Sequence, residues 1–540
     1  MNWYETPLGA AIVKEAQDRA QKPRNRALSG AIRQRMYSSA RHDRLTAGWS
    51  PANSSADAEL VSSLTVLRSR SRALVRDSSY AKRARVLVVN NVIGQGIGLQ
   101  AQVYNSRAEL NARVNDEIEL VWSEWCKAEN CHTGGRLHFK NFERALMAQV
   151  FEAGEVFIRK HVTRFGDSRI PFALELIEAE RVADDYHYPG LPAGSGNTVR
   201  MGIELDSFFR PVAYYVRQRH PSELRFDGTA TDQIERVPAD QIIHLSIVDR
   251  WPQTRGEPWL HTVVRRLNDL DGYTEAEVIR ARAQAVRMGI IQTPDDAATF
   301  GEEQADGSVE MELAPGTVAR LNPGETWIDS APSAPNPQLD PFMRYMLREM
   351  AAGIGVSYES LSRDYSQSNY SSSRLALLDD RDLWRAIQGW FIVDFREKIH
   401  HSWLQMAVLS GAIRSISIDA FAADVRKFES VRFRPRGWGW VDPTKEVEAF
   451  KAAVRAGFAT LQDVVSQSGG DIEEILEQRS KEIALADEYG LVLDTDPEQV
   501  ATSGAAQAPE KPPPDQVDEL PDPEANPPAK RVSTFLRPVK

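Results

Sequence analysis

One stretch decides the fold: GIGVSYESLSRDYSQSNYSSSRLAL, at residues 353–377. It is rich in Ser, Tyr, Gln and Asn, and residues 366–373 carry no charge. On either side apolar residues recur every four positions, the spacing of one helix face. The repeats are Phe342, Met346, Met350 and Ile354 before it, and Ile387, Phe391, Phe395, Ile399 and Trp403 after it. We therefore expect helices at 339–354 and 374–409, separated by a polar loop at 356–373.

This uncharged polar loop has two interpretations. Its composition is typical of an exposed linker. It would also suit a surface that touches DNA and lets it slide, because hydroxyls and amides make weak, exchangeable contacts with phosphate. Many Lys and Arg contacts would instead bind the polyanion tightly and in a salt-dependent way.

Toward the N-terminus, helical patterns flank one strand-rich region. We expect helix over 57–93, 111–127 and 141–153, then short alternating strands over 155–250. The motif GEPWL at 256–260 opens a helical pattern that runs to about residue 290, and Pro258 suits a first helical turn. Two strands, SVEMEL and TVARL, are expected within 291–337.

Toward the C-terminus, 441–490 is predicted to be helical. Asp463 is expected to initiate a short helix and Asp471 to cap the next one. From residue 501 the chain is mainly Pro, Ala, Glu and Asp, which predicts a disordered tail. These patterns together predict an α+β fold that is mainly α.

The composition is that of a globular protein, with 540 residues of which 42 % are apolar and 26 % charged. No apolar run approaches the roughly 20 residues needed to span a bilayer, so we expect no membrane partner and a cytoplasmic origin. The net charge of −11 argues against a surface that grips nucleic acid everywhere. Two stretches, 14–44 and 68–85, are nevertheless basic. Each is interpreted as a solvated face or as a surface for DNA or an acidic partner.

No catalytic, metal or cofactor site is predicted. Cys126 and Cys131 lie near His132 and His138, but the spacing C-x4-C-H matches no common zinc pattern, and we expect reduced thiols near a helix end. A further group of carboxylates, expected to point outward from the second long helix, consists of Asp379, Asp380 and Asp382.

The glycines of NNVIGQGIGLQ, at residues 90–100, raise the possibility of a phosphate-binding loop. Dinucleotide sites place G-x-G-x-x-G after a strand and before a helix. Here the order is helix, G-x-G-x-G and strand, which predicts a helix C-cap and a tight turn. The motifs G-x-x-x-x-G-K-[ST], H-E-x-x-H and G-x-S-x-G are absent from the sequence. The sequence therefore gives no indication of an enzymatic function.

Four segments carry a resemblance to a known family. The stretch at 353–377, SSYAKRARVLVVNNVIGQGIGLQ at 78–100, RGEPWL at 255–260 and RGWGWVDPTKEVEA at 436–449 resemble, in order, segments of portal proteins of lambda-type tailed bacteriophages. The resemblance spans roughly residues 60–490. It implies a non-enzymatic structural protein that forms a ring, usually of twelve subunits, at one capsid vertex.

The resemblance also implies a division of the chain into the parts of a portal fold. They are a basic N-terminal arm (1–50), a wing (51–255), stem helices (256–290 and 338–355), a clip (291–337), a tunnel loop (356–373), a long wing helix and return (374–444), a crown (445–500) and a Pro-rich tail (501–540). In the tunnel loop the residues expected to face DNA are Tyr365, Ser366, Gln367, Ser368, Asn369 and Tyr370.

The implied partners follow from the same resemblance. They are other copies of the chain, double-stranded DNA in the channel, the terminase large subunit, the head–tail connector or adaptor, the major capsid protein and the scaffold. The protein would be part of the virion, assembled in the host cytoplasm, and would serve genome packaging and ejection. The alternatives are a DNA-packaging or nucleotide-driven DNA-processing enzyme, and a monomeric DNA-binding regulator.

Overall fold

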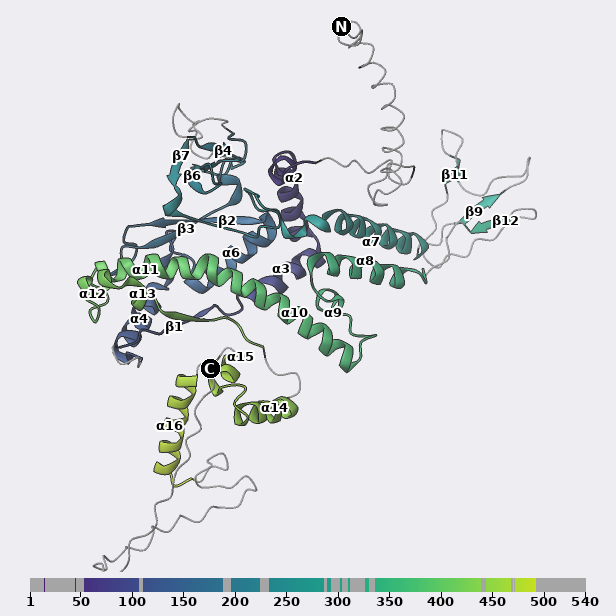
Figure 1. Ribbon diagram of the computed structural model, residues 1–540. Coiled ribbons are helices and arrows are strands. Elements are labelled where there is room, and N and C mark those ends of the chain that lie inside the picture. The colour runs from purple at the N-terminus through teal and green to yellow at the C-terminus, as the bar shows by residue number, and fades with distance from the viewer. Residues whose placement is uncertain are drawn as a thin grey trace, which may run out of the picture. The chain divides into compact units, whose positions relative to one another are not determined.

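The chain consists of two compact units, residues 1–436 and 437–540, which we call the N-terminal and C-terminal units (Figure 1). The computed structural model describes residues 53–105, 110–187, 196–223, 233–285, 336–438, 443–467 and 472–491, with four short strand segments between 289 and 329 and residues 14, 44 and 470. The predicted arm at 1–50 and tail at 501–540 lie almost entirely outside these residues. No helix in the described parts is long and apolar enough to cross a membrane.

The N-terminal unit begins with a group of helices. The single pattern expected at 57–93 is two helices, α2 (Ala56–Asp77) and α3 (Ser79–Val92), because Ser78 between them has an extended backbone. α4 (Ala112–Trp125) and α6 (Phe139–Ala153) follow as predicted, and a short helix that was not predicted, α5 (Ala128–Cys131), lies between them. After α3, Gly94 and Gly96 take positive φ angles and β1 (Gly98–Ala101) begins, which confirms the predicted order of helix, turn and strand.

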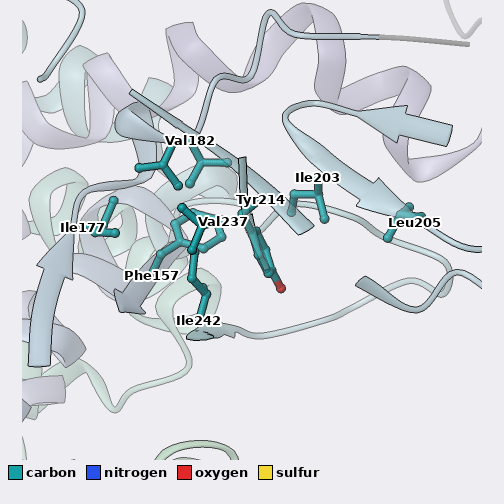
Figure 2. Packing of buried hydrophobic residues seen from close by; sticks show 9 residues of the cluster. Phe157, Ile177, Val182, Ile203, Leu205, Tyr214, Val237 and Ile242 are labelled. Carbon is teal, nitrogen blue, oxygen red and sulfur yellow. The ribbon is translucent and has the colours of Figure 1, made fainter. Parts of the chain in front are cut away.

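The strand-rich region contains two antiparallel sheets. One has the order β3-β2-β8 and the other the order β4-β5-β6-β7. The strands are β2 (Glu155–His161), β3 (Ala173–Ile177), β4 (Thr198–Arg200), β5 (Ile203–Leu205), β6 (Pro211–Arg217), β7 (Ile234–Pro238) and β8 (Ile242–Ser246), with short 3-10 turns at Ala179–Arg181 and Ala239–Gln241. Phe157 and Ile177 of the first sheet pack with Tyr214 and Val237 of the second, so the two sheets share one core (Figure 2).

One long helical rod crosses the N-terminal unit. It runs through α10 (Tyr370–Phe391), a π-helical segment (Ile392–Glu397) and α11 (Lys398–Leu409). All five apolar residues of the predicted stripe, from Ile387 to Trp403, are buried, and the Trp403 ring lies 4.8 Å from that of Trp122 on α4. The short α12 (Ile418–Ala423) and α13 (Val425–Phe428) lead to β13 (Val431–Arg434), which pairs with β1.

A pair of helices, α7 (Val264–Ala285) and α8 (Leu339–Ile354), runs side by side (Figure 1). The helix expected from 256 to about 290 is shorter. Pro258 precedes a 3-10 turn (Trp259–Thr262), and residue 290 belongs to β9 (Gly289–Gln292). β9 pairs with β12 (Thr326–Asp329), and β10 (Glu302–Glu303) pairs with β11 (Val309–Glu310) inside the predicted SVEMEL strand. The predicted TVARL strand lies outside the described residues.

The C-terminal unit contains α14 (Pro443–Arg455), α15 (Leu461–Gln467) and α16 (Ile472–Glu488). Asp463 lies inside α15, and Thr460, directly before its first residue, caps the helix. The Thr460 amide and hydroxyl both donate to Asp463 Oδ2, and the Asp463 amide donates back to Thr460 Oγ1. Asp471 is outside the described residues. None of the residues whose burial is described in this unit is buried. The predicted class, α+β and mainly α, is confirmed.

Candidate DNA-facing loop

The polar stretch that follows α8 is more ordered than a linker. α8 ends at Ile354 and is capped by Gly355, which has a φ of 85° and whose amide donates to the carbonyls of Ala351 and Ala352. A short helix, α9 (Tyr358–Ser362), comes next, and α10 begins at Tyr370 rather than at residue 374. The loop predicted at 356–373 is therefore reduced to 363–369, which we call the polar loop from here on.

The beginning of α9 is bonded to α10 through Asp380. The carboxylate of Asp380 accepts hydrogen bonds from the Ser357 amide at 2.7 Å, from Ser357 Oγ at 2.8 Å and from Ser360 Oγ at 2.6 Å. Asp380 is only 5 % exposed. The prediction that Asp380 points outward is wrong, because α9 folds back over this face of α10.

Two other helices hold α9 as well. On α3, Arg83 Nε donates to the Ser360 carbonyl at 3.2 Å, across 277 positions of sequence. On α8, the Arg348 guanidinium lies 5.3 Å from the centre of the Tyr358 ring. The polar loop therefore starts from a short helix that α3, α8 and α10 all contact.

At its start the polar loop is tied down by Asp364. Tyr358 donates its hydroxyl hydrogen to Asp364 Oδ2 at 2.8 Å, and the Ser366 amide donates to Oδ1 at 3.0 Å. Hydrogen bonds from Ser366 and Tyr358 lower the pKa of Asp364 to about 2, so this carboxylate is charged at neutral pH. Arg344 Nε of α8 lies 3.6 Å from it and offsets that charge.

At its end the polar loop enters α10 through a capping box. The Ser372 amide donates to Asn369 Oδ1 at 2.8 Å, and the Asn369 amide donates to Ser372 Oγ at 3.1 Å. Between the two anchors, Ser368 Oγ donates to the Tyr365 carbonyl at 3.0 Å. Of the six residues predicted to face DNA, five lie in the polar loop and Tyr370 is the first residue of α10.

Beyond the charged Arg363 and Asp364, the side chains from Tyr365 to Ser373 are uncharged and mostly exposed. Tyr365 is 60 % and Tyr370 59 % exposed, and Ser366, Gln367 and Asn369 are exposed as well. From Tyr365 to Ser373 the outward groups are phenols, hydroxyls and amides. Such groups hydrogen-bond to a phosphate oxygen or to water with little difference in strength, and none supplies a full charge. The segment is thus a pre-ordered, neutral polar surface.

The basic stretch at 68–85 is engaged within the fold. Arg68 is buried and contacts the fully buried Glu155 together with Arg255, which donates to the same carboxylate at 2.6 Å. Further along, Arg72 pairs with Glu180, Arg76 with Asp77 and Arg85 with Glu152, at 2.7–2.9 Å. Arg68, Arg72 and Arg85 therefore neutralise carboxylates of this unit, whereas Arg76 and Asp77 are largely exposed, as expected of a solvated face. The use of this stretch as a partner surface stays a prediction. The other basic stretch, 14–44, lies outside the described residues apart from its two end residues.

Cys126 and Cys131 are buried free thiols at helix ends, as predicted. Burial raises the pKa of Cys131 to about 12 and that of Cys126 well above its usual range, so both are protonated and unreactive at neutral pH. Among the described residues, no three His, Cys, Asp or Glu side chains come together as a metal site.

Comparison with known proteins identifies the class. Residues 42–388 match the family model described as phage portal protein, lambda family. The match covers well over half of the chain, and the chain belongs to this family. The prediction of a lambda-type portal protein is confirmed.

Individual relatives agree with the family. The chain is 29 % identical over 475 residues to the probable portal protein of Halomonas phage phiHAP-1, covering 85 % of this chain and 89 % of the relative. It is 22 % identical to portal protein B of Escherichia phage lambda (80 % and 86 % covered) and 24 % identical to the portal protein of Escherichia phage N15 (81 % and 87 % covered).

Solved structures with a similar chain come from gene transfer agent particles. One, from the virion of the native particle, is 13 % identical with a TM-score of 0.39, covering 76 % of this chain and 93 % of that one. Another, from the neck of the native particle computed with C12 symmetry, is 13 % identical with a TM-score of 0.37, covering 72 % and 89 %.

Proposed function

We propose that this portal protein closes into a ring, usually of twelve copies, around a channel through which double-stranded DNA enters and leaves the capsid, with the polar loop lining the channel. The observation that carries the proposal is the pre-ordered neutral surface at 365–370, in a chain that belongs to the portal family. A polyanion moving along its axis meets a deep electrostatic well wherever cations line the path. Hydroxyls and amides allow contact with phosphate while leaving the DNA free to move.

The remaining parts of the chain take the roles that the family implies. The helices and sheets of 51–255 with the long rod after residue 373 form the wing, α7 and α8 the stem, the strands between them the clip, and α14 to α16 the crown. The pairing of α7 with α8, and their connection through β9 to β12, support a stem that carries a small strand module at one end. The clip would meet the terminase large subunit during packaging and the head–tail connector afterwards.

The protein would act without enzymatic activity or cofactor of its own, and would assemble in the host cytoplasm with the major capsid protein and scaffold before becoming part of the virion. The rival function is a nucleotide-driven packaging enzyme. Its expected phosphate-binding loop is absent from the sequence. Hydrolysis of ATP by the purified protein above that of a buffer blank would favour this rival, and a native mass of one or two subunits would favour a monomeric regulator.

The decisive experiment adds charge to the polar loop without disturbing its anchors. Gln367 is exposed and lies between the Asp364 turn and the Asn369 cap. Gln367→Lys places one cation per subunit at the channel, and Gln367→Met is a neutral control of similar size. We expect both variants to form rings in negative-stain images. We expect Gln367→Lys to reduce the DNase-protected DNA per particle several-fold, and Gln367→Met to leave it near the wild-type value.

The outcome that would contradict the proposal is equally specific. If particles with the Gln367→Lys protein contain as much DNase-protected DNA as wild-type particles, at both low and physiological salt, the polar loop does not line the channel. Assembled particles that are solid at their axis would contradict the channel itself.

A further inference from the structure

We propose that Asp380 is a positioning residue for the polar loop: its buried carboxylate bonds the first turn of α9 to α10 and thereby sets where Tyr365 to Asn369 project. This inference rests on the proposed function of the loop. It concerns a carboxylate that, unlike its neighbours, is removed from solvent and bonded across the two arms of the loop.

The hydrogen bonds of Asp380 join the two arms of the loop. The chain leaves α9, passes through the polar loop and returns along α10, so Ser357 and Ser360 lie on one arm and Asp380 on the other. Three hydrogen bonds of 2.6–2.8 Å join the two arms. They close a loop of about twenty residues, which reduces the conformations open to the segment between them. The capping box at Asn369 is a second set of bonds, at the point where the polar loop enters α10.

The carboxylate of Asp380 matches the donors that surround it. Three donors, one amide and two hydroxyls, converge on the two oxygens of one carboxylate. A carboxylate is the only side chain of this size that accepts at both oxygens, and hydrogen bonds to it are stronger than those to a neutral acceptor. An Asn in its place would have to turn its NH2 group toward the two hydroxyls, which would then accept, and the resulting neutral hydrogen bonds would be weaker than those to a carboxylate. Asp at this position therefore offers an acceptor to each of the three donors.

Asp380 differs from the neighbouring carboxylates in its surroundings. Asp379 and Asp382 are exposed on the same helix, and Asp382 pairs with Arg385 at 2.7 Å. Only Asp380 faces α9. Asp379→Asn therefore removes the same charge one residue away without touching the α9 contact, which makes it a matched control.

The test measures loop position and DNA packaging separately. In a Gln367→Cys background a nitroxide label is attached to the introduced thiol; the native Cys126 and Cys131 are 7 % and 1 % exposed and are not expected to react. We expect the label to become markedly more mobile on adding Asp380→Asn, and to be unchanged by Asp379→Asn. Amide hydrogen exchange of residues 358–362 should become roughly tenfold faster in the first variant only, since a buried charge-assisted hydrogen bond is lost.

In particles that carry the native Gln367, Asp380→Asn should lower the DNase-protected DNA while rings still form. Label mobility equal in the Asp380→Asn and Asp379→Asn proteins would overturn the positioning role. Increased mobility with normal packaging would uphold that role and instead contradict the DNA-facing function of the loop. If Asp380→Asn does not fold, Ser360→Ala, which removes a single donor, takes its place in the same measurements with the same expected directions.

Discussion

The two units of this chain differ in where their apolar side chains lie. In the N-terminal unit, Trp125, Phe391 and Trp403 are at most 1 % exposed and belong to one aromatic cluster. In the C-terminal unit Phe458 is 87 % and Leu461 59 % exposed, and no residue of described burial is buried. Both units are built from amphipathic helices, so the difference is one of packing and not of pattern.

The difference shows which part of the chain carries its own stability. α14, α15 and α16 have 13, 7 and 17 residues, and isolated helices of such length are marginal in water. Most helical stability in proteins comes from packing an apolar face against another element. The N-terminal unit supplies such partners within itself. Among the described residues of the C-terminal unit, none supplies such a buried partner.

The largest expected effect contrasts one aromatic residue from each unit. Trp403→Ala removes a fully buried side chain in contact with Trp122, and we expect it to lower the free energy of unfolding by about 3–5 kcal/mol. Phe458→Ala, at an exposed site, should change it by less than about 0.5 kcal/mol. Urea unfolding followed by circular dichroism of the isolated subunit compares the two. Equal destabilisation would mean that the C-terminal unit has a core after all.

A second prediction uses two glutamates whose surroundings are opposite. Burial raises the pKa of Glu143 to about 7, although Arg396 Nη1 lies 3.3 Å from its carboxylate. In the C-terminal unit, a hydrogen bond from Lys481 lowers the pKa of the exposed Glu477. Because Glu143 titrates near about 4.3 when unfolded, its contribution to stability is complete at low pH and is lost as the pH rises through about 7.

We therefore expect the free energy of unfolding of the wild type to fall between about pH 5 and pH 8 more steeply than that of Glu143→Gln. Glu129→Gln, at an exposed position of the same unit, is the control and should follow the wild type. The measurement is urea unfolding at a series of pH values. Parallel profiles for the wild type and Glu143→Gln would show that Glu143 is already ionised in the folded protein.

The sequence predicted the parts of the fold that depend on periodicity. The rod through α10 and α11 was predictable because five apolar residues from Ile387 to Trp403 share one face, and all five are buried. The ends of the polar loop were not predictable from periodicity, since they depend on side chains that cap helices. With Asn369 as its cap, α10 starts four residues before the apolar pattern suggested. An Asn three residues before a Ser was a signal for this cap.

Asp380 was missed for a different physical reason. Its neighbours Asp379 and Asp382 are exposed, and carboxylates so close together on a helix are ordinarily solvated. Its burial follows from α9 folding back, and so from the hydrogen bond that Arg83, 277 positions earlier, makes to the Ser360 carbonyl of α9. Contacts of this kind leave no local signal. The same holds for the basic stretch at 68–85, where Arg68 and Arg72 pair with Glu155 and Glu180, far along the chain, which the local charge pattern does not reveal.

The smallest expected effect concerns helix caps. It tests whether the start of α10 depends on its cap as the helices of the C-terminal unit do. Leu375 is 71 % and Leu378 40 % exposed, so the first turns of α10 also lack packing within the subunit. Their order then depends on the capping box at Asn369, and that of α15 on the one at Thr460. Loss of a cap costs about 1 kcal/mol. We expect Asn369→Ala and Thr460→Ala to speed amide exchange about fivefold in the first turns of α10 and α15 respectively.

Neither substitution should shift the midpoint of global unfolding in the isolated subunit, because neither helix end contributes to the buried core that sets it. Ser417→Ala removes the cap of α12 and serves as the comparison. This helix belongs to the N-terminal unit and is packed against it, since its Phe421 is buried. If exchange at α12 rises as much as at α10, caps and not packing hold these helix ends everywhere in the chain. A rise confined to α10 and α15 would instead show that the start of α10 resembles the C-terminal helices in depending on its cap. Such helix starts would then be surfaces that only neighbouring subunits complete.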